Sequence, residues 1–262
     1  MKLSLFSSKL LITTLVSLTI NCLFNFSVRT EEINAARHQH QPVRSQSKSS
    51  QDEKLDFSGD GRPGKRAGGG SRSSCPSTKT PLTALVPASN AGTTVSDRPS
   101  FWFYVPYTPE QSSAGEFVLQ DKQENDVYRQ TFTLPPTPGL VSLQLPQTAP
   151  ALNVDRPYRW YFKLYCSDSA LATANFVEGW VRRVSLKSDL ATKLEQKKNL
   201  AYKEYGNHLI WFDALDSLAR LRSHQDNARL KRDWSQLLGA EGVNLRELSQ
   251  KPLVGKVESH TK

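Results

Sequence analysis

The sequence predicts a mainly β protein, an immunoglobulin-like antiparallel β-sandwich of about seven strands followed by a small C-terminal α-helical segment. Two contrasting patterns predict this fold class. Between residues 75 and 185, short apolar, β-branched and aromatic runs alternate with turns rich in proline and glycine, as in a series of strands. Between residues 186 and 250, apolar residues recur at spacings of three and four, which is the pattern of helices.

Seven segments of 75–185 have the length and composition of strands, and no helical pattern separates them. Because hairpins join antiparallel strands without intervening helices, such a series favours an antiparallel sandwich. The expected strands are Leu82–Val86, Ser100–Val105, Glu116–Gln120, Val127–Leu134, Leu140–Leu145, Tyr158–Cys166 and Phe176–Val184.

The segment 158–166 indicates which side chains face the core. Side chains of a strand point alternately to its two faces. We expect the apolar set to face inward, namely Tyr158, Trp160, Phe162, Leu164 and Cys166. The other set then covers a solvated face and consists of Arg159, Tyr161, Lys163 and Tyr165.

Three short helices are expected after residue 186, each with one apolar stripe. The first begins near Ser188, a suitable N-cap, the second runs from about Asn207 to Arg222, and the third ends before Gly239. The stripes consist of Leu190, Leu194 and Ala201; of Trp211, Leu215, Leu218 and Leu221; and of Leu230, Trp234, Leu237 and Leu238. The spacing leaves open whether the helices pack on the sandwich or bind a partner. Residues 251–262 are expected to form a flexible tail.

The N-terminal segment 1–36 has the features of a secretory signal. Lys2 and Lys9 precede the uncharged run 10–28, and charged residues follow it. We therefore expect an exported protein of the periplasm or cell envelope. The run is also nearly long enough to span a bilayer, so an uncleaved membrane anchor formed by residues 10–28 is the alternative.

Residues 37–74 are expected to form a disordered, basic linker rich in glycine, serine and glutamine. Phe57 is the only aromatic residue of this stretch, and eight basic residues outnumber four acidic ones. Such a composition buries too little apolar surface to offset the entropy lost on ordering.

The cysteines fit an oxidising compartment. Removal of the signal removes Cys22 and leaves Cys75 and Cys166, which we expect to form one disulfide that closes a loop of about ninety residues. Two free buried thiols are the alternative.

Charge and residue types argue against several classes of function. The net charge is +9, but residues 75–185 contain nine basic and nine acidic residues, so we expect no nucleic-acid partner. No histidine lies within 75–185, which leaves the sandwich without the base that a serine or cysteine nucleophile requires. We expect no catalytic site, no cofactor and no metal site.

Five runs carry a likeness to a known family: PLTALVP (81–87), DRPSFWFYVPY (97–107), EFVLQD (116–121), YRWYFKLYC (158–166) and FVEGWVRR (176–183). In this order they resemble the domain-of-unknown-function 928 family of bacteria, mostly cyanobacteria. The Gly/Arg-rich segment before Cys75 and the run HLIWFDALDSLARLR (208–222) are similar to it too, so the resemblance covers about residues 59–255. It implies an exported, single-domain unit without an assigned activity, and it supplies no catalytic residues.

We expect a non-enzymatic protein-interaction module with an unidentified envelope protein as partner; the alternatives are a glycan-binding sandwich and an unrecognised hydrolase. An exposed apolar patch would favour a protein partner, a row of solvent-facing rings a glycan, and a deep polar pocket an enzyme. Glu178 shares a face with Trp180, and we weigh a contact site there against a surface ion pair. The candidate partner or ligand surface consists of Trp211, Leu218, Tyr161, Tyr165, Glu178 and Arg182.

Overall fold

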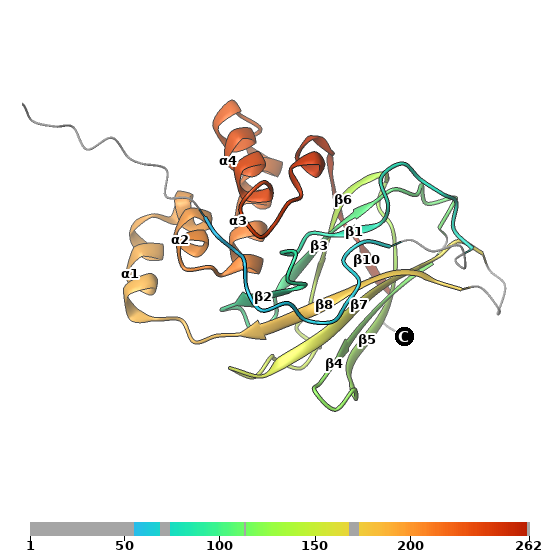
Figure 1. The fold of residues 1–262 in the computed structure, drawn as a ribbon, viewed down its shortest axis with the longest axis horizontal. Helices are drawn as coiled ribbons and strands as arrows, with labels where there is room; N and C mark the ends of the chain where they lie inside the picture. Colours follow the sequence, from blue (N-terminus) through green and yellow to red (C-terminus); the bar gives the residue numbers. More distant parts are fainter. Residues whose placement is uncertain (1–54, 69–73, 113, 168–172, 261–262) are drawn as a thin grey trace, which may run out of the picture. The chain divides into compact units, whose positions relative to one another are not determined.

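The computed structural model describes residues 55–68, 74–112, 114–167 and 173–260, which form a mainly β unit with two mixed sheets and four α-helices (Figure 1). The predicted signal or anchor at 1–36 lies outside the described residues. None of the helices in the described ranges combines the length and the apolar character needed to cross a bilayer.

The two sheets contain four and six strands. The smaller sheet has the order β1 (Thr83–Ala84), β3 (Ser100–Val105), β6 (Gly139–Gln144) and β9 (Leu253–Lys256). The larger sheet has the order β10 (Glu258–His260), β5 (Asp126–Thr133), β4 (Ala114–Gln120), β7 (Pro157–Tyr165), β8 (Asn175–Arg183) and β2 (Ala91–Thr94). Both sheets are mixed because the pairs β6–β9 and β2–β8 are parallel, whereas the other pairs are antiparallel.

The long central strands lie where the sequence predicts them, but the edge strands differ. The described residues contain ten strands, not seven, and the two parallel pairs depart from a purely antiparallel arrangement. Strand β2 (AGTT) lacks the apolar alternation of a strand, so its pairing with β8 had no sequence signal. Strands β9 and β10 replace part of the predicted flexible tail, because their backbones pair with β6 and β5 and Val257 between them is buried.

Aromatic side chains join the two sheets. Phe103 of β3 stacks on Phe162 of β7 with ring centroids 3.9 Å apart, and Phe101 lies 5.7 Å from Trp160. Along β7 the even-numbered residues 158–164 are buried and the odd-numbered ones are partly exposed, which confirms the predicted alternation. The core between the sheets is therefore formed by the inward faces that the strand pattern indicates.

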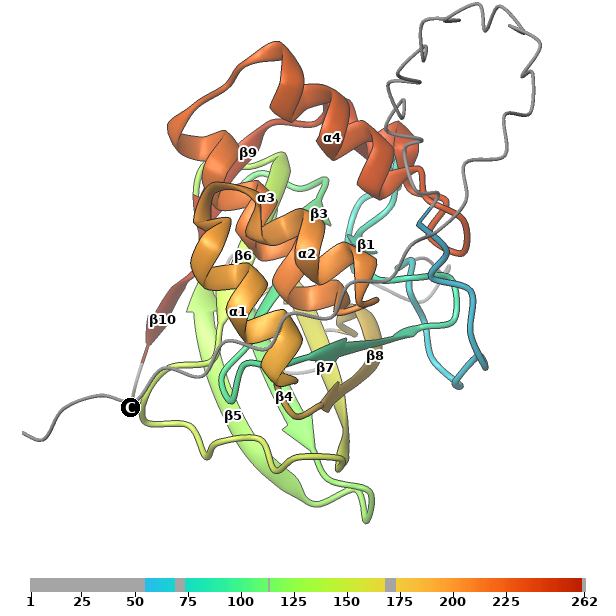
Figure 2. The ribbon, with the colours of Figure 1, turned by 90° about the vertical axis from the view of Figure 1, so that its left-hand side faces the viewer.

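The four helices form a layer, and the third of them contacts the other face of the four-stranded sheet. They are α1 (Ser188–Gln196), α2 (Ala201–Asn207), α3 (Trp211–His224) and α4 (Ala228–Leu238). Figure 2 shows α1 to α3 in front of β3 and β6, and Trp102 of β3 donates a hydrogen bond of 3.1 Å to Asp216 of α3. Strand β3 is buried along its whole length because it is covered on both faces. Helix α3 therefore packs on β2 and β3, and α2 and α4 pack on α3.

The helix boundaries differ from prediction at two places. The first expected helix is divided into α1, a short 3₁₀ turn η1 (Lys198–Leu200) and α2, and Lys187 rather than Ser188 is its N-cap. The second begins at Trp211 instead of near residue 207, because Leu209 has a positive φ of 57° that ends α2. The third ends at Leu238 with Gly239 as its C-cap, as predicted.

Residues 55–68, which we call the strap, are folded against the unit, so the prediction of a disordered linker is wrong for this part of 37–74. Phe57 is buried, and its ring lies 5.0 Å from that of Trp211. The Arg66 guanidinium donates to the carbonyl oxygens of Val86 and Val243 at 3.3 and 2.6 Å. One anchoring ring and a few backbone contacts hold the strap, which explains why its composition resembles that of a linker.

The predicted disulfide between Cys75 and Cys166 is confirmed. It joins the residues that precede β1 to the end of β7, with the two Cα atoms 4.9 Å apart. The bond links the start of the four-stranded sheet to the centre of the six-stranded one.

Candidate functional site

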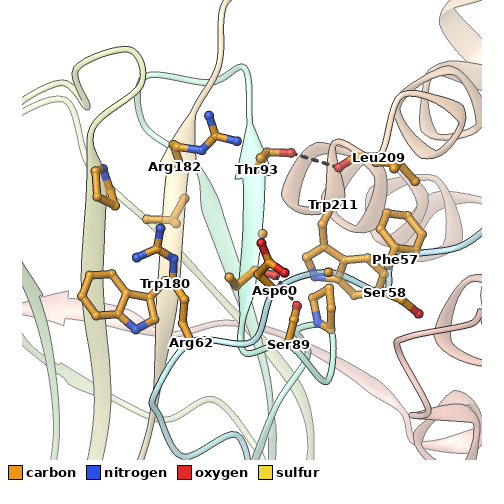
Figure 3. Close-up of a pocket in the computed structure, with 16 residues that line it drawn as sticks. Phe57, Ser58, Asp60, Arg62, Ser89, Thr93, Trp180, Arg182, Leu209 and Trp211 are labelled. Atoms are coloured by element: carbon orange, nitrogen blue, oxygen red, sulfur yellow. Dashed lines mark hydrogen bonds between the residues drawn. The ribbon is translucent and has the colours of Figure 1, made fainter.

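A pocket of about 260 Å³ opens beside β8, between the strap, β2 and the turn before α3 (Figure 3). We call it the β8 pocket. Segments from three distant parts of the chain meet there, and they stay in place because the strap and α3 both pack on the edge formed by β2. Its lining consists of Phe57, Ser58, Gly59, Asp60, Arg62, Pro87, Ser89, Ala91, Gly92, Thr93, Pro157, Trp180, Val181, Arg182, Leu209 and Trp211.

The inner wall of the β8 pocket is rigid. Trp211 is fully buried, and its indole N–H donates to the Leu85 carbonyl oxygen at 2.9 Å. Thr93 of β2 donates its hydroxyl to the Leu209 carbonyl oxygen at 2.9 Å, which ties the turn before α3 to the sheet. These contacts fix the wall without a ligand, as is usual for small-molecule sites.

The rim of the pocket carries both hydrogen-bond donors and acceptors. Asp60 and Arg62 come from the strap, and Arg182 comes from β8; all three are exposed. Arg182 lies 3.5 Å from the carboxylate of Asp155. Within the described residues, no carboxylate lies in ion-pair distance of Arg62. The rim therefore presents one carboxylate and two guanidinium groups around an opening that also contains hydroxyl groups.

A row of aromatic rings leads away from the pocket across the outer face of the six-stranded sheet. It consists of Trp180 and Phe176 on β8 and Tyr161 on β7, each partly exposed. The rings of Tyr161 and Phe176 are 6.4 Å apart. Trp180 belongs to both the row and the pocket, and its indole N–H donates to the Pro63 carbonyl oxygen of the strap at 2.9 Å. Row and pocket thus form one continuous surface.

Cationic side chains lie against every ring of this row. The Arg62 guanidinium is 5.2 Å from the Trp180 ring and the Lys65 ammonium is 4.8 Å from the Phe176 ring. At such distances a cation is attracted to the electron-rich face of an aromatic ring. The remaining contacts are those of Arg159 with Tyr161 at 5.1 Å and with Trp180 at 5.8 Å, and of Lys163 with Tyr161 at 5.8 Å.

The acidic residues of this face serve as ion-pair partners. Glu178 is buried and lies 2.6 Å from the Arg159 guanidinium, and Glu116 contacts both Lys163, at 3.0 Å, and Arg129. Burial alone would raise the pKa of Glu116, but hydrogen bonds from Lys163 and Arg129 outweigh it, so the pKa lies below its usual value. Of the two roles considered for Glu178, the structure shows an ion pair. This ion pair holds Arg159 against the rings of Tyr161 and Trp180.

A second pocket, of about 150 Å³, lies at the junction of β2, β3, β6 and α3 and contains the carboxyl of Asp213. Burial raises the pKa of Asp213 to about 6, which hydrogen bonds from the Thr94 side chain and the Val95 backbone N–H partly oppose. The Val95 N–H donates to Asp213 at 3.1 Å. Thr94 is the last residue of β2 and Val95 follows it, so Asp213 connects the first turn of α3 to the end of that strand.

A comparison with family models identifies one match, over residues 67–253, to the family described as Domain of Unknown Function (DUF928). The chain belongs to this family. A comparison with curated proteins finds no match. The matched range contains β1 to β8 and all four α-helices, whereas residues 55–66 of the strap lie before it. One wall of the β8 pocket is thus formed by residues that precede the matched range.

The predicted partner surface of this DUF928 domain is not assembled as expected. Trp211 and Leu218 are fully buried, so the prediction that they face a partner is wrong: their stripe packs on the sheet and on the strap. Tyr161 lies in the aromatic row and Arg182 on the rim of the pocket. Tyr165 is partly exposed near the end of the same strand as Tyr161.

The sequence analysis missed the residues that the strap brings to the site, above all Asp60 and Arg62. They lie in a stretch whose composition is typical of a linker; its sequence signals were the aromatic Phe57 within a polar run and the family resemblance, which begins at about residue 59. Leu209 was missed because its strained backbone has no signature in a single sequence. Across the described ranges, no three metal-ligating side chains are grouped closely enough to hold an ion.

Proposed function

We propose that the chain is an exported, non-enzymatic binding module of the periplasm or cell envelope that holds a glycan on the outer face of the six-stranded sheet. The observation that carries the proposal is the row of Trp180, Phe176 and Tyr161 that ends in the β8 pocket. The confirmed disulfide supports export, because such bonds persist in oxidising compartments. We also propose an immunoglobulin-like sandwich for the two sheets, supported by the stacked rings of Phe103 and Phe162 between them.

Glycans suit this surface because of their mixed chemistry. One face of a sugar ring carries C–H groups that pack on an aromatic ring, while its hydroxyl groups need donors and acceptors at the edge. The row provides the rings. The rim provides carboxylate, guanidinium and hydroxyl groups. Ion pairs and cation–ring contacts hold the cationic side chains in place, so little side-chain entropy is lost on binding.

A protein partner is less well supported than the sequence suggested. The apolar stripe of α3, on which that prediction relied, is buried in the fold. Among the described residues, the exposed large hydrophobic side chains are Val154, Leu186 and Leu209, and they come from three separate segments. Three exposed side chains are weak support for a protein-binding surface, which is typically a larger contiguous apolar patch.

The test is binding of the tagged full chain to a printed array of bacterial envelope oligosaccharides, followed by titration of the glycans that it retains. We expect retention by the wild type and an affinity about fivefold or more weaker for Trp180→Ala, because stacking on an aromatic ring contributes of the order of 1 kcal/mol or more. Leu186→Ala removes an exposed apolar side chain outside the pocket and should bind as the wild type does.

Two results would overturn the proposal. One is a wild-type chain that retains no glycan but crosslinks reproducibly to an envelope protein. The other is glycan binding that is unaffected in both Trp180→Ala and Tyr161→Ala, with melting temperatures close to that of the wild type.

A further inference from the structure

Leu209 occupies a backbone position that leucine rarely adopts. It follows α2 with a φ of 57°, its N–H donates to the Gly206 carbonyl oxygen, and the next N–H, of Ile210, donates to the Tyr205 carbonyl oxygen. This pair of hydrogen bonds is the Schellman pattern that ends many helices, and glycine is the usual residue at the left-handed position. A side chain at that position brings Cβ too close to the backbone.

The helix end requires the left-handed conformation at Leu209, but it does not require a leucine side chain there. Five residues other than glycine have a positive φ in the described ranges, and the other four, Asn90, Glu124, Asp155 and Asn244, are polar. Leu209 is the aliphatic one, and 48 % of its surface is exposed, so burial does not account for its presence. Strained residues cluster at ligand sites, where contact with the ligand accounts for the choice of side chain.

The position of Leu209 supplies a second, independent observation. It lines the β8 pocket on the side of α3, whereas Trp180 lies on the opposite side with β8, and Asp60 lies between them (Figure 3). The hydrogen bond from Thr93 fixes the turn that carries Leu209. Leu209 and Trp180 therefore line the same pocket from opposite sides.

The size and charge of the opening restrict what it can enclose. Its volume of about 260 Å³ is below the range of about 300–1,000 Å³ typical of sites for drug-sized ligands. Two guanidinium groups, Arg62 and Arg182, are balanced by two carboxylates, Asp60 on the rim and Asp155 beside Arg182. A single small, uncharged ligand unit satisfies both restrictions.

We propose that Leu209 is a ligand-contacting residue and that the β8 pocket takes one uncharged sugar unit at the end of a glycan chain, held between Leu209 and Trp180. The inference rests on the proposed glycan-binding function and adds to it the charge and position of the bound unit. The strap and the turn before α3 close the pocket on one side, and the aromatic row leaves it on the other. The next sugars of the chain then lie along Phe176 and Tyr161.

The test uses the full chain and compares Leu209→Gly, Leu209→Ala and wild type for stability and for glycan affinity. Leu209→Gly should raise the melting temperature by roughly 2–4 °C, because glycine adopts the left-handed conformation without strain. Both variants should bind glycans about fivefold to tenfold more weakly, since each removes the half-exposed apolar side chain from the contact. The binding probes are neutral monosaccharides, such as glucose, galactose and N-acetylglucosamine, and glucuronic acid as the charged counterpart.

Two matched controls separate strain from ligand contact. Glu124→Gly relieves a positive φ of 63° in the β4–β5 turn, outside the pocket, and should raise the melting temperature without changing affinity. Leu186→Ala removes a leucine side chain of similar exposure and should leave affinity unchanged.

The outcomes separate this inference from the proposed function. If Trp180→Ala loses glycan binding but both Leu209 variants bind as the wild type does, the role of Leu209 is refuted and the proposed function stands. A preference for glucuronic acid over the neutral sugars would refute an uncharged unit. A wild-type chain that retains no glycan would overturn the proposed function and this inference with it.

Discussion

Replacement of Asp213 by asparagine should stabilise the protein at neutral pH. Asp213 lies in the first turn of α3, and burial raises its pKa from the ordinary value of 3.8 to about 6. Because the folded-state pKa exceeds the unfolded one, the folded protein binds more protons between these values, and its stability falls as the pH rises through about 6. Asparagine keeps the shape of the side chain and removes the charge.

The magnitude follows from the difference in pKa. A difference of about two units corresponds to roughly 3 kcal/mol of destabilisation above pH 6. Solvent in the adjacent pocket reduces this penalty, and asparagine loses about 1 kcal/mol if it satisfies only one of the two hydrogen bonds that Asp213 accepts. We therefore expect Asp213→Asn to raise the free energy of unfolding by about 1–2 kcal/mol at pH 7.5 and, because the loss of a hydrogen bond does not depend on pH, to lower it by up to about 1 kcal/mol at pH 4.

Urea unfolding followed by tryptophan fluorescence between pH 4 and 8 measures this difference. Glu124→Gln, in the exposed β4–β5 turn, is the control that removes a carboxylate without changing a buried site. The reasoning is refuted if the difference between Asp213→Asn and wild type is independent of pH, or if the variant is the less stable protein at pH 7.5.

Three further predictions concern the contacts that hold the layers together. Cys75→Ser combined with Cys166→Ser should lower the free energy of unfolding by about 3–5 kcal/mol in the chain-entropy model, and a non-reducing denaturant series that shows no loss would contradict it. Phe57→Ala should cost about 3 kcal/mol and increase proteolysis within the strap, because the ring leaves a cavity beside Trp211. Trp102→Phe should cost about 1–3 kcal/mol by leaving the Asp216 carboxylate without one donor; calorimetry with no shift in melting temperature would show that water replaces the indole.

The central strands were predictable because their composition and alternation are strong. In β7 the alternation of Trp160 and Phe162 with Tyr161 and Lys163 directly encodes two faces, and the structure follows it. The edge strands were not predictable, because a strand such as β2 is held by one parallel neighbour and by α3 rather than by its own pattern. Parallel pairing between segments far apart in the chain leaves no local signal.

Half of the candidate site was predictable for the same reason. Tyr161 and Arg182 lie on strands with a clear outer face, so their exposure followed from alternation. Trp211 has the same helical spacing whether its stripe meets a partner or the protein's own sheet, and only the fold decides between them. Asp60 reaches the site because a single buried ring, that of Phe57, anchors the strap. The rest of the strap has the composition of a linker.

The last described residues have a consequence for the order of assembly. Strand β9 completes the four-stranded sheet against β6, and β10, two residues later, adds the outer strand of the six-stranded sheet beside β5. A polypeptide emerges from a ribosome or a translocation channel with its N-terminus first. The four-stranded sheet cannot acquire β9 until residue 256 has emerged, and the six-stranded sheet cannot acquire β10 until residue 260 has, so a chain delivered only as far as α4 exposes the edges of β5 and β6 at the same time. Folding of the whole unit therefore requires that the chain has emerged as far as residue 260.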